Sequence, residues 1–497
     1  MATKAPSENW YIEIDMPFAG LSPAYWANTY ASFGNKNMAR SMNAIDLSDP
    51  TGFSQGPALA NLTNGTGAGG ALSGNITHIL GVPPQNGFTY GVGGNYLYQI
   101  SPTAVTQAGS WPHEITGQSG IEAESSFLLE GKLYYVYNYT GAGDIGQYDL
   151  ASTFVDNWGS TGPATGAAAL VNAPHPSIVG NDNNAYIGNG SLVACYDPDS
   201  DTLTVDCLDV PGGSQVVDLR YLSSRVWIAV NFPNYGGSNQ TTGIIYVWEG
   251  EGIESWDDTP NPRIQGTIGA LYAFGGTMFV WYQEVGFTGG YKLGYIKGNS
   301  IAEVAQYSGT LPNFAQVFEH QNCLAWVSNG TIMKWGSSSS KIPVALSKYM
   351  NCGYSTVGGA AVPFGSVMIA SSQSGLYRLA AASGLDTTSD LKTLMFGVGR
   401  SVIDKIAISY GPLASGAAVN IYIDGDQGLL TPFALNDNNG NSGISAANDA
   451  TICEKMFNPS CDIANEFGLD FDFSVGSASN PVLIRKVKIW GHSNPAE

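Results

Sequence analysis

The chain has 497 residues and carries 40 acidic against 20 basic side chains, a net charge of −20. Such a surface repels nucleic acid and anionic membranes, which disfavours a protein that reads DNA or RNA sequence. Charged residues are only 12% of the chain, while 63 Gly and 25 Pro leave little material for long amphipathic helices. Because 43% of the residues are hydrophobic, a large core is available, and we expect an all-β protein.

Residues 1–75 come before any repeat and are rich in Gly, Asn and Ser between 52 and 74. Residues 10–14 predict one strand, which joins the last sheet of the repeat described next, or another subunit, or lies on the surface. We interpret 1–75 as an arm or latch, because it has too few periodic apolar residues for a core of its own. We expect no secretory signal, because no apolar segment precedes the acidic Glu13 and Asp15, and no membrane insertion, because no apolar run approaches 18 residues.

Between residues 76 and 396 one sequence pattern repeats: an apolar strand, a tight turn, a second apolar strand, a loop, and a third strand ending near an aromatic. The clearest copies begin at Tyr272, Phe127 and Phe318. Seven such aromatics follow one another at intervals of 40 to 52 residues: Tyr98, Tyr148, Tyr196, Trp248, Tyr295, Trp335 and Tyr377. A period of this length built from short strands is typical of β-propeller blades, so the chain predicts a propeller of seven blades.

A closed ring has a physical reason. A small antiparallel sheet buries its faces only against neighbouring sheets, and radial repetition gives every sheet two neighbours. Gly275–Gly276, Gly93–Gly94 and Ser223–Ser224 mark tight turns between the strands. The alternative is an ordinary sandwich with irregular strands.

Residues 397–497 change pattern. Strands are predicted at 402–410, 418–423, 468–473 and 482–490, separated by Gly/Asn-rich loops. Their spacing is longer than that of the repeat, which favours a small C-terminal β-sandwich over an eighth blade.

Signals for catalysis are few. The histidines are scattered, without an H-E-x-x-H pair, and neither a G-x-S-x-G elbow nor a P-loop occurs. A propeller glycosidase needs two carboxylates facing a central pocket, and the sequence cannot show that any two converge. The candidates are Glu122, Glu124, Asp218 and Glu284. We predict a protein that is not an enzyme and has no catalytic, cofactor or metal site.

Two further groups leave alternatives open. Asp197, Asp199 and Asp201 alternate as in calcium loops but lack the EF-hand Gly and Glu, and Asp is also common in plain turns. None of the six cysteines forms a C-x-x-C pair. Cys195/Cys207 and Cys453/Cys461 either form disulfides in an oxidising medium or remain buried thiols.

In style and order the chain resembles virion proteins of tailed bacteriophages that carry a β-propeller. The likeness is carried by the N-terminal stretch 28–34, the degenerate blade at 90–98 and the strand opening at 403–410. It covers most of the chain without a diagnostic motif, and it brings no catalytic residue to match. The resemblance implies a tail, nozzle or hub component located in the virion, assembled in the host cytoplasm.

The sequence is compatible with three functions. The first is a non-enzymatic virion component, a homo-oligomer contacting other virion proteins, in assembly, DNA passage or host contact. The second is a carbohydrate-binding or carbohydrate-cleaving propeller, with Tyr and Trp stacking on host-surface glycans. The third is a surface adhesin stiffened by calcium.

Overall fold

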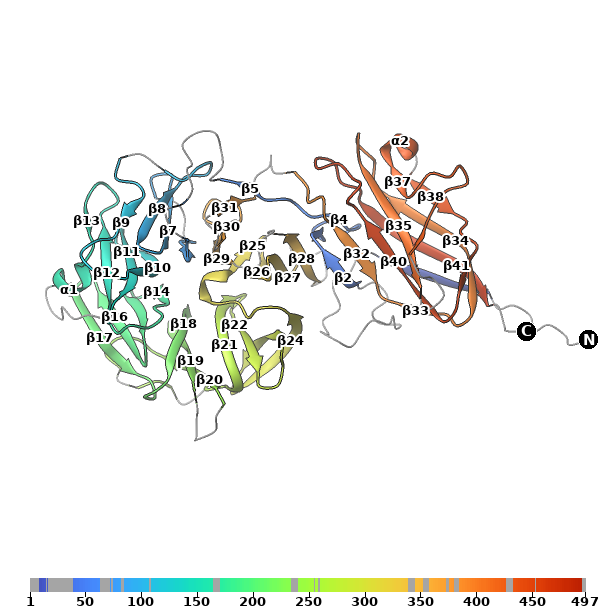
Figure 1. The fold of residues 1–497 in the computed structure, drawn as a ribbon. Helices are drawn as coiled ribbons and strands as arrows, with labels where there is room; N and C mark the ends of the chain where they lie inside the picture. The colour runs from blue at the N-terminus through green and yellow to red at the C-terminus, as the bar shows by residue number, and fades with distance from the viewer. Residues whose placement is uncertain are drawn as a thin grey trace, which may run out of the picture.

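The fold is a ring of small sheets beside a two-sheet sandwich, seen in a computed structural model (Figure 1). The structure describes residues 9–14, 16, 39–62, 72, 75–81, 85–106, 109–163, 170–233, 240–253, 255–257, 260–337, 345–351, 357–371, 375–379, 384–425, 432–451 and 453–493. Helix is confined there to α1 (Trp158–Thr161), α2 (Ala446–Asp449) and the 3-10 turn η2 (Phe314–Gln316). The all-β prediction is confirmed.

The ring is built from four-stranded antiparallel units, in which consecutive strands pair except at the outer edge of the last unit. Five are separate sheets, and a seven-stranded sheet supplies two more that share strand β21, which makes seven units in the described residues. The first three are β6 (His78–Ile79), β7 (Thr89–Gly93), β8 (Tyr96–Ile100), β9 (His113–Glu114); β10 (Glu122–Leu129), β11 (Lys132–Tyr139), β12 (Ala142–Tyr148), β13 (Phe154–Val155); and β14 (Ser177–Val179), β15 (Ala185–Asn189), β16 (Leu192–Asp197), β17 (Thr202–Asp209).

Units four and five are joined through β21, which pairs with β20 up to Gln265 and with β22 from Gly266 on. The seventh unit takes its fourth strand from far upstream, because β5 pairs with β31. Units four and five contain β18 (Gln215–Leu222), β19 (Arg225–Phe232), β20 (Thr242–Trp248), β21 (Arg263–Phe274), β22 (Thr277–Glu284), β23 (Gly290–Lys297) and β24 (Ser300–Ser308). Unit six contains β25 (Val317–His320), β26 (Cys323–Ser328), β27 (Thr331–Gly336) and β28 (Ala345–Asn351). Unit seven contains β29 (Val357–Ala361), β30 (Met368–Ser371), β31 (Gly375–Arg378) and β5 (Ala60–Asn61).

The ring is closed by its innermost strands. The first strand of each unit contacts the first strand of the next, and β29 of the seventh unit contacts β6 of the first. Seven separate apolar clusters lie at the seven junctions; the closing one joins Tyr98 and Ile100 to Met368 and Leu376. This cyclic stack is a β-propeller.

Turn chemistry follows the sequence. Gly275 and Gly276 join β21 to β22 with φ of +57° and +76°, and Ser223 and Ser224 join β18 to β19 with φ of +55° and +60°. Both pairs form the left-handed corner that matches the twist of a hairpin, which the glycines adopt without strain and the serines do not.

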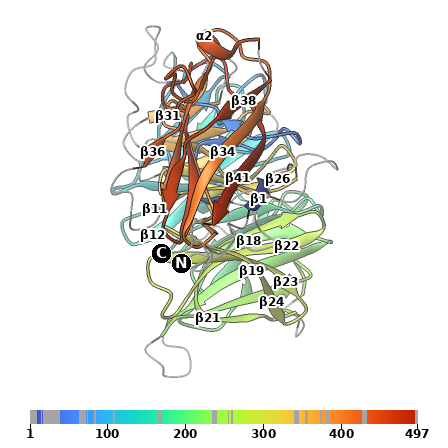
Figure 2. The same ribbon diagram turned by 90° about the vertical axis from the view of Figure 1, so that its right-hand side faces the viewer.

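The sandwich consists of two sheets that share one apolar core. Figure 2, turned by 90°, shows it in front of the propeller. One sheet holds β1 (Asn9–Ile14), β41 (Ile484–Ser493), β34 (Ser401–Tyr410), β38 (Glu454–Phe457) and β39 (Cys461–Ile463). The other holds β2 (Ala39–Asn43), β32 (Asp390–Thr393), β40 (Glu466–Asp472), β35 (Ala418–Gly425), β36 (Phe433–Ala434), β33 (Phe396–Gly397) and β37 (Ile444–Ser445), and a short hairpin of β3 (Ile45–Asp46) and β4 (Ser54–Gln55) lies outside both sheets.

Two boundary predictions need correction. Strand 10–14 does not close the last unit: as β1 it pairs with β41, and the closing strand is β5. The propeller also ends before residue 396, because β32 and β33 pair with β40 and bury Leu391 and Phe396 in the sandwich core. Residues 39–43 lie in that same sheet, since β2 pairs with β32. The stretch 28–34 lies outside the described residues.

Candidate functional site

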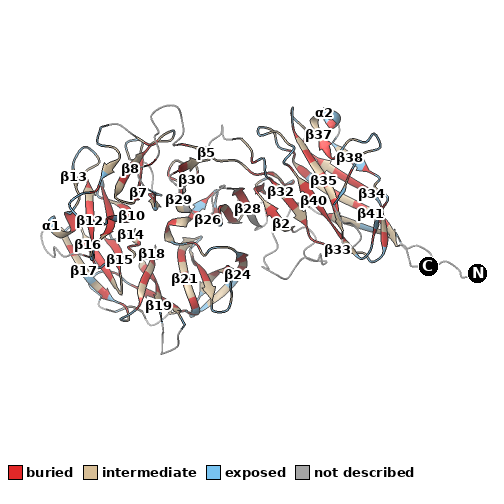
Figure 3. Ribbon diagram, viewed as in Figure 1, coloured by how far each residue is buried: buried red, intermediate tan, exposed pale blue. Residues whose placement is uncertain are grey.

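A cavity of about 320 Å³ lies on the axis of the propeller. All seven innermost strands, or the residues next to them, contribute to its lining. Buried and half-buried residues alternate along several of these strands, and β14 is half-buried throughout (Figure 3). The volume is that of a small-molecule pocket, which typically measures about 300–1,000 Å³.

Arg220 supplies the positive charge of the cavity. Its Nε donates to the Leu271 carbonyl at 2.9 Å, and a terminal nitrogen donates to the Phe314 carbonyl at 2.9 Å. The guanidinium also lies 3.3 Å from the buried Asp218 carboxylate and 5.5 Å from the centre of the Tyr272 ring. Arg220 is therefore held in place by the fourth, fifth and sixth units around it.

His78 stands across the cavity with a hydrogen bond of 3.2 Å between its Nδ1 and Ser126 Oγ. Burial, with a smaller contribution from Arg220, lowers the pKa of His78 to about 4, so this imidazole is neutral at pH 7. Burial raises the pKa of Tyr272, which stays protonated. The cavity thus offers one fixed cation, neutral hydroxyl and imidazole groups, and the exposed carboxylate of Glu319.

The structure does not gather the four candidate carboxylates. Glu122 and Glu124 are neighbours on β10, but neither lines the axial cavity; burial raises the pKa of Glu124, and Asn138 donates to it at 3.2 Å. Asp218 lies beneath Arg220, where it accepts the Leu271 N–H at 2.6 Å; burial raises its pKa to about 6. Glu284 pairs with Lys292 at 2.7 Å beside a different pocket. Among the described lining residues Glu319 is the single acid.

Polar bridges between units escaped the sequence analysis. Asn138 and Asn231 are the penultimate residues of the second strands of units two and four, and each amide exchanges two hydrogen bonds with the backbone of the next unit. For Asn231 both bonds, to the N–H and carbonyl of Ile268, measure 2.9 Å. An Asn one residue before the end of the second strand, at 138 and 231, is the signal that could have revealed them.

The segment that holds Asp197, Asp199 and Asp201 forms a turn between β16 and β17. Asp197 accepts the Asp199 N–H at 2.9 Å and the Ser200 hydroxyl at 2.7 Å, bonds that lower its pKa. Asp201 accepts the Tyr196 hydroxyl at 3.1 Å. In the part of the chain that the structure describes, one group of side chains is close enough to share a metal ion, and it contains Cys195, Cys207 and Glu251 but none of these aspartates.

The remaining thiols and histidines have local roles. Cys195, Cys207, Cys453 and Cys461 are all free thiols, so neither proposed disulfide is present. His175 is buried against the Gly188 carbonyl at 2.7 Å, His113 pairs with Asp156 at 2.7 Å, and His492 pairs with Asp404 at 2.8 Å. No helix within the described ranges is long and apolar enough to cross a membrane.

Comparisons with known proteins give only distant likenesses. No family model matches the chain, and no curated protein matches its sequence. Solved structures that resemble it include the extracellular domain of a one-component system from B. thetaiotaomicron, with 8% identity, TM-score 0.39, and coverage of 73% of this chain and 44% of that one. This chain therefore spans less than half of that protein's length.

Two others are a glycoside hydrolase family 43 arabinoxylan arabinofuranohydrolase from Bacillus subtilis (12% identity, TM-score 0.28, 84% and 97% of the two chains) and Drosophila Semaphorin 1a (9%, 0.38, 62% and 86%). With TM-scores below 0.5 these likenesses carry no argument about function. The propeller assignment rests on the strand order and the closed ring of junctions.

Proposed function

We propose that this chain is a non-catalytic structural protein of a tailed-phage virion, in the tail, nozzle or hub region, acting through its outer surface. The observation that carries the proposal is the division of the N-terminal strands: β1 and β2 complete the sandwich, and β5 completes the seventh unit of the ring. The upstream segment thereby joins both parts, which would suit a component held between neighbours in a particle. The working unit is a seven-bladed propeller with a C-terminal sandwich.

The chemistry of the axial cavity supports a role without catalysis. Hydrolysis of a glycosidic bond uses two carboxylic groups on either side of the bond. The described lining offers Glu319 alone, while Asp218 is engaged by Arg220 and the Leu271 N–H. His78 is held neutral by burial and bonded to Ser126, so its environment is that of a structural side chain.

The cavity also bears on DNA passage. A pocket of about 320 Å³ holds a small molecule and does not pass a duplex. Any DNA path would therefore run between subunits of a homo-oligomer, where the net charge of −20 would keep the wall from binding phosphate.

Mass photometry and negative-stain electron microscopy of the purified full-length chain test the proposal. A discrete homo-oligomer, or specific attachment to phage tails mixed with the protein, is expected. A protein that stays monomeric, attaches to no particle and hydrolyses a glycan would overturn it.

A second candidate, carbohydrate binding, is favoured by one surface. Tyr11 on β1 and Trp490 on β41 lie side by side on the outer face of the sandwich, with ring centres 5.3 Å apart. Tyr11 is 48% exposed, and the Lys405 ammonium lies 5.0 Å from the centre of the Trp490 ring. An exposed Tyr11 beside a half-buried Trp490, flanked by the Lys405 ammonium, offers a platform on which a sugar ring can stack.

A glycan array combined with a reducing-sugar assay separates the two candidates. If the platform binds sugars, Trp490→Ala should abolish array signals, whereas Tyr422→Ala, a half-buried tyrosine on the other sheet, should leave them unchanged. A virion scaffold without glycan contact is expected to be silent in both assays.

A further inference from the structure

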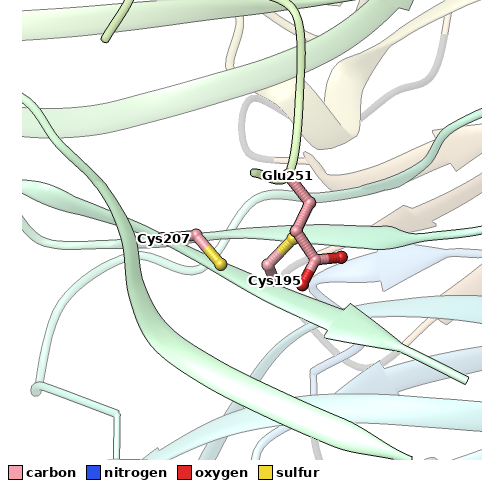
Figure 4. Close-up of side chains that lie close together, drawn as sticks. All are labelled: Cys195, Cys207 and Glu251. Carbon is pink, nitrogen blue, oxygen red and sulfur yellow. The ribbon is translucent and has the colours of Figure 1, made fainter. Parts of the chain in front are cut away.

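Two thiols and one carboxylate converge where the third and fourth units of the ring meet (Figure 4). Cys195 lies on β16, Cys207 on β17, and Glu251 in the loop that follows β20 of the next unit. One ligand atom from each side chain lies within 4.8 Å of the other two. Cys195 is buried, Cys207 half-buried and Glu251 exposed, so the group is open to solvent on one side.

The local fold explains why the thiols meet. Pairing between β16 and β17 is irregular here: Val193 faces Leu208, but Cys195 faces Thr204. The extra residues on β17 form a bulge, and a bulge redirects side chains that a regular ladder would separate. Both thiols consequently pack in the apolar cluster shared by units three and four.

Glu251 is held over the thiols by the third unit. Asn184 Nδ2 donates to Glu251 Oε2 at 3.0 Å, and the backbone N–H of Glu251 donates to the Tyr186 hydroxyl at 3.4 Å. Tyr186 in turn donates to Asp182. This second layer fixes the direction of the carboxylate, as the outer partners of metal ligands commonly do.

The charge around the group is uncompensated. The carboxylates of Asp197 and Asp182 act on Glu251 as like charges. Within the described residues none of these three carboxylates takes part in a salt bridge. A concentration of negative charge without a basic partner favours a cation at this place.

We propose that Cys195, Cys207 and Glu251 bind one thiophilic divalent cation of the zinc type, with water in the fourth position. Zinc takes thiolate sulfur at about 2.3 Å and carboxylate oxygen at about 2.0–2.2 Å, which places tetrahedral ligand atoms about 3.5–3.8 Å apart. That spacing lies inside the observed 4.8 Å limit. The ion would join two neighbouring units of the ring across their junction.

Binding must release a proton. A hydrogen bond with Cys207, and burial, raise the pKa of Cys195, so this sulfur carries a proton before a metal binds. That proton leaves as the sulfur–metal bond forms, because the metal takes thiolate sulfur. Apparent affinity should accordingly rise with pH, by up to about 10-fold per unit while Cys195 is protonated.

Titration of reduced, metal-stripped, full-length protein with Co²⁺ under anaerobic conditions tests the proposal. We expect near-ultraviolet thiolate-to-cobalt absorption that saturates at one equivalent and is displaced by Zn²⁺. Cys207→Ser, at a half-buried position, should weaken binding at least 100-fold, and Glu251→Gln about 10-fold. Cys323→Ser, a buried thiol in the sixth unit, is the matched control and should bind as the unmodified chain does.

Zn²⁺ should also raise the unfolding temperature of the unmodified chain but not that of Cys207→Ser, because only the former can link the two units. Absence of a saturable absorption band, or a band that Cys207→Ser leaves intact, would overturn the site. A Cys195–Cys207 disulfide that survives treatment with a reducing agent would also overturn the site.

Discussion

The propeller and the sandwich bury their apolar residues in different ways. In the sandwich one continuous cluster takes side chains from both sheets and from the N-terminal strands, including Ile14, Phe53 and Phe471. In the propeller each junction between neighbouring units has its own smaller cluster. Polar bridges such as those of Asn138 and Asn231 then cross the junctions. The sandwich is therefore one cooperative core, and the ring depends on many local joints.

Truncating the sandwich core should give the largest effect. Phe471 is fully buried and meets Phe53 edge-on at 5.3 Å, so Phe471→Ala should lower the free energy of unfolding by about 3–5 kcal/mol. Urea unfolding followed by fluorescence measures the loss. Tyr422→Ala, on the adjacent strand and half-buried, should cost less than about 1 kcal/mol. Equal losses in both variants would remove the distinction between a single core and its outer face.

Acid should weaken the propeller selectively. Burial lowers the pKa of three propeller histidines, His78, His175 and His320, to about 4. The unfolded chain binds protons at these groups from about pH 6.5 downwards, so the stability they contribute is complete above pH 6.5 and is lost as pH falls towards 4. Each should contribute a slope of about 1.4 kcal/mol per pH unit in that window.

Asp218 opposes this trend. Its folded pKa, raised to about 6 by burial, means that the folded state takes up a proton first, so this group gains stability as pH falls through 6. Urea unfolding at pH 7 and pH 5 measures the net slope. His320→Gln should flatten it by one histidine's share. A slope that is unchanged in His320→Gln would contradict the assignment.

Removing a polar bridge should cost the ring less than the core truncation costs the sandwich. Asn231→Ala deletes both hydrogen bonds to Ile268 and leaves a buried N–H and carbonyl without partners, for an expected loss of about 1–3 kcal/mol. Asn95→Ala removes only an exposed bond of 3.1 Å to Glu114 and should be near neutral. Hydrogen exchange localised to units four and five would report the opened junction.

The smallest expected effect is a gain. Replacing Ser223 by Asn and Ser224 by Gly suits a turn in which both residues have positive φ. The double variant should be more stable by about 0.5–1 kcal/mol, measured by urea unfolding. The same residues placed at Gly275–Gly276 should change stability little, since that turn already holds glycines. Destabilisation by the Ser223/Ser224 change would mean that these hydroxyls have an unrecognised role.

Much of the ring could be predicted because each unit has the same local pattern of apolar strands and turns in its sequence. The seven predicted aromatics fall in the third strands of the seven units, from Tyr98 on β8 to Tyr377 on β31. The four C-terminal strands also occur where alternation predicted them, as β34, β35, β40 and β41. Local periodicity reports strands well, because alternation of apolar and polar residues is a property of a few consecutive positions.

The candidate site was harder to predict from the sequence than the strands. Nothing in the spacing of Arg220, His78 and Glu319 indicates that they line one cavity, because they come from different units that meet only around the axis. The same holds for Cys195 and Glu251, which are separated in sequence and joined by a junction. Motifs reveal chemistry when its residues are neighbours in the chain, and here they are neighbours only in space.

The strands of the repeat and the all-β class could be inferred from the amino-acid sequence, since these depend on short-range patterns of apolar residues and turns. Which upstream strand closes the ring, and which strands complete the sandwich, became visible only in the folded chain. β5 has only two residues, Ala60 and Asn61, which is too short for a recognisable pattern. The apolar residues of β1 would suit an edge of the propeller as well as an edge of the sandwich. Pairing partners are selected by the open edge that each fold presents, and an edge exists only once the rest of the sheet has formed.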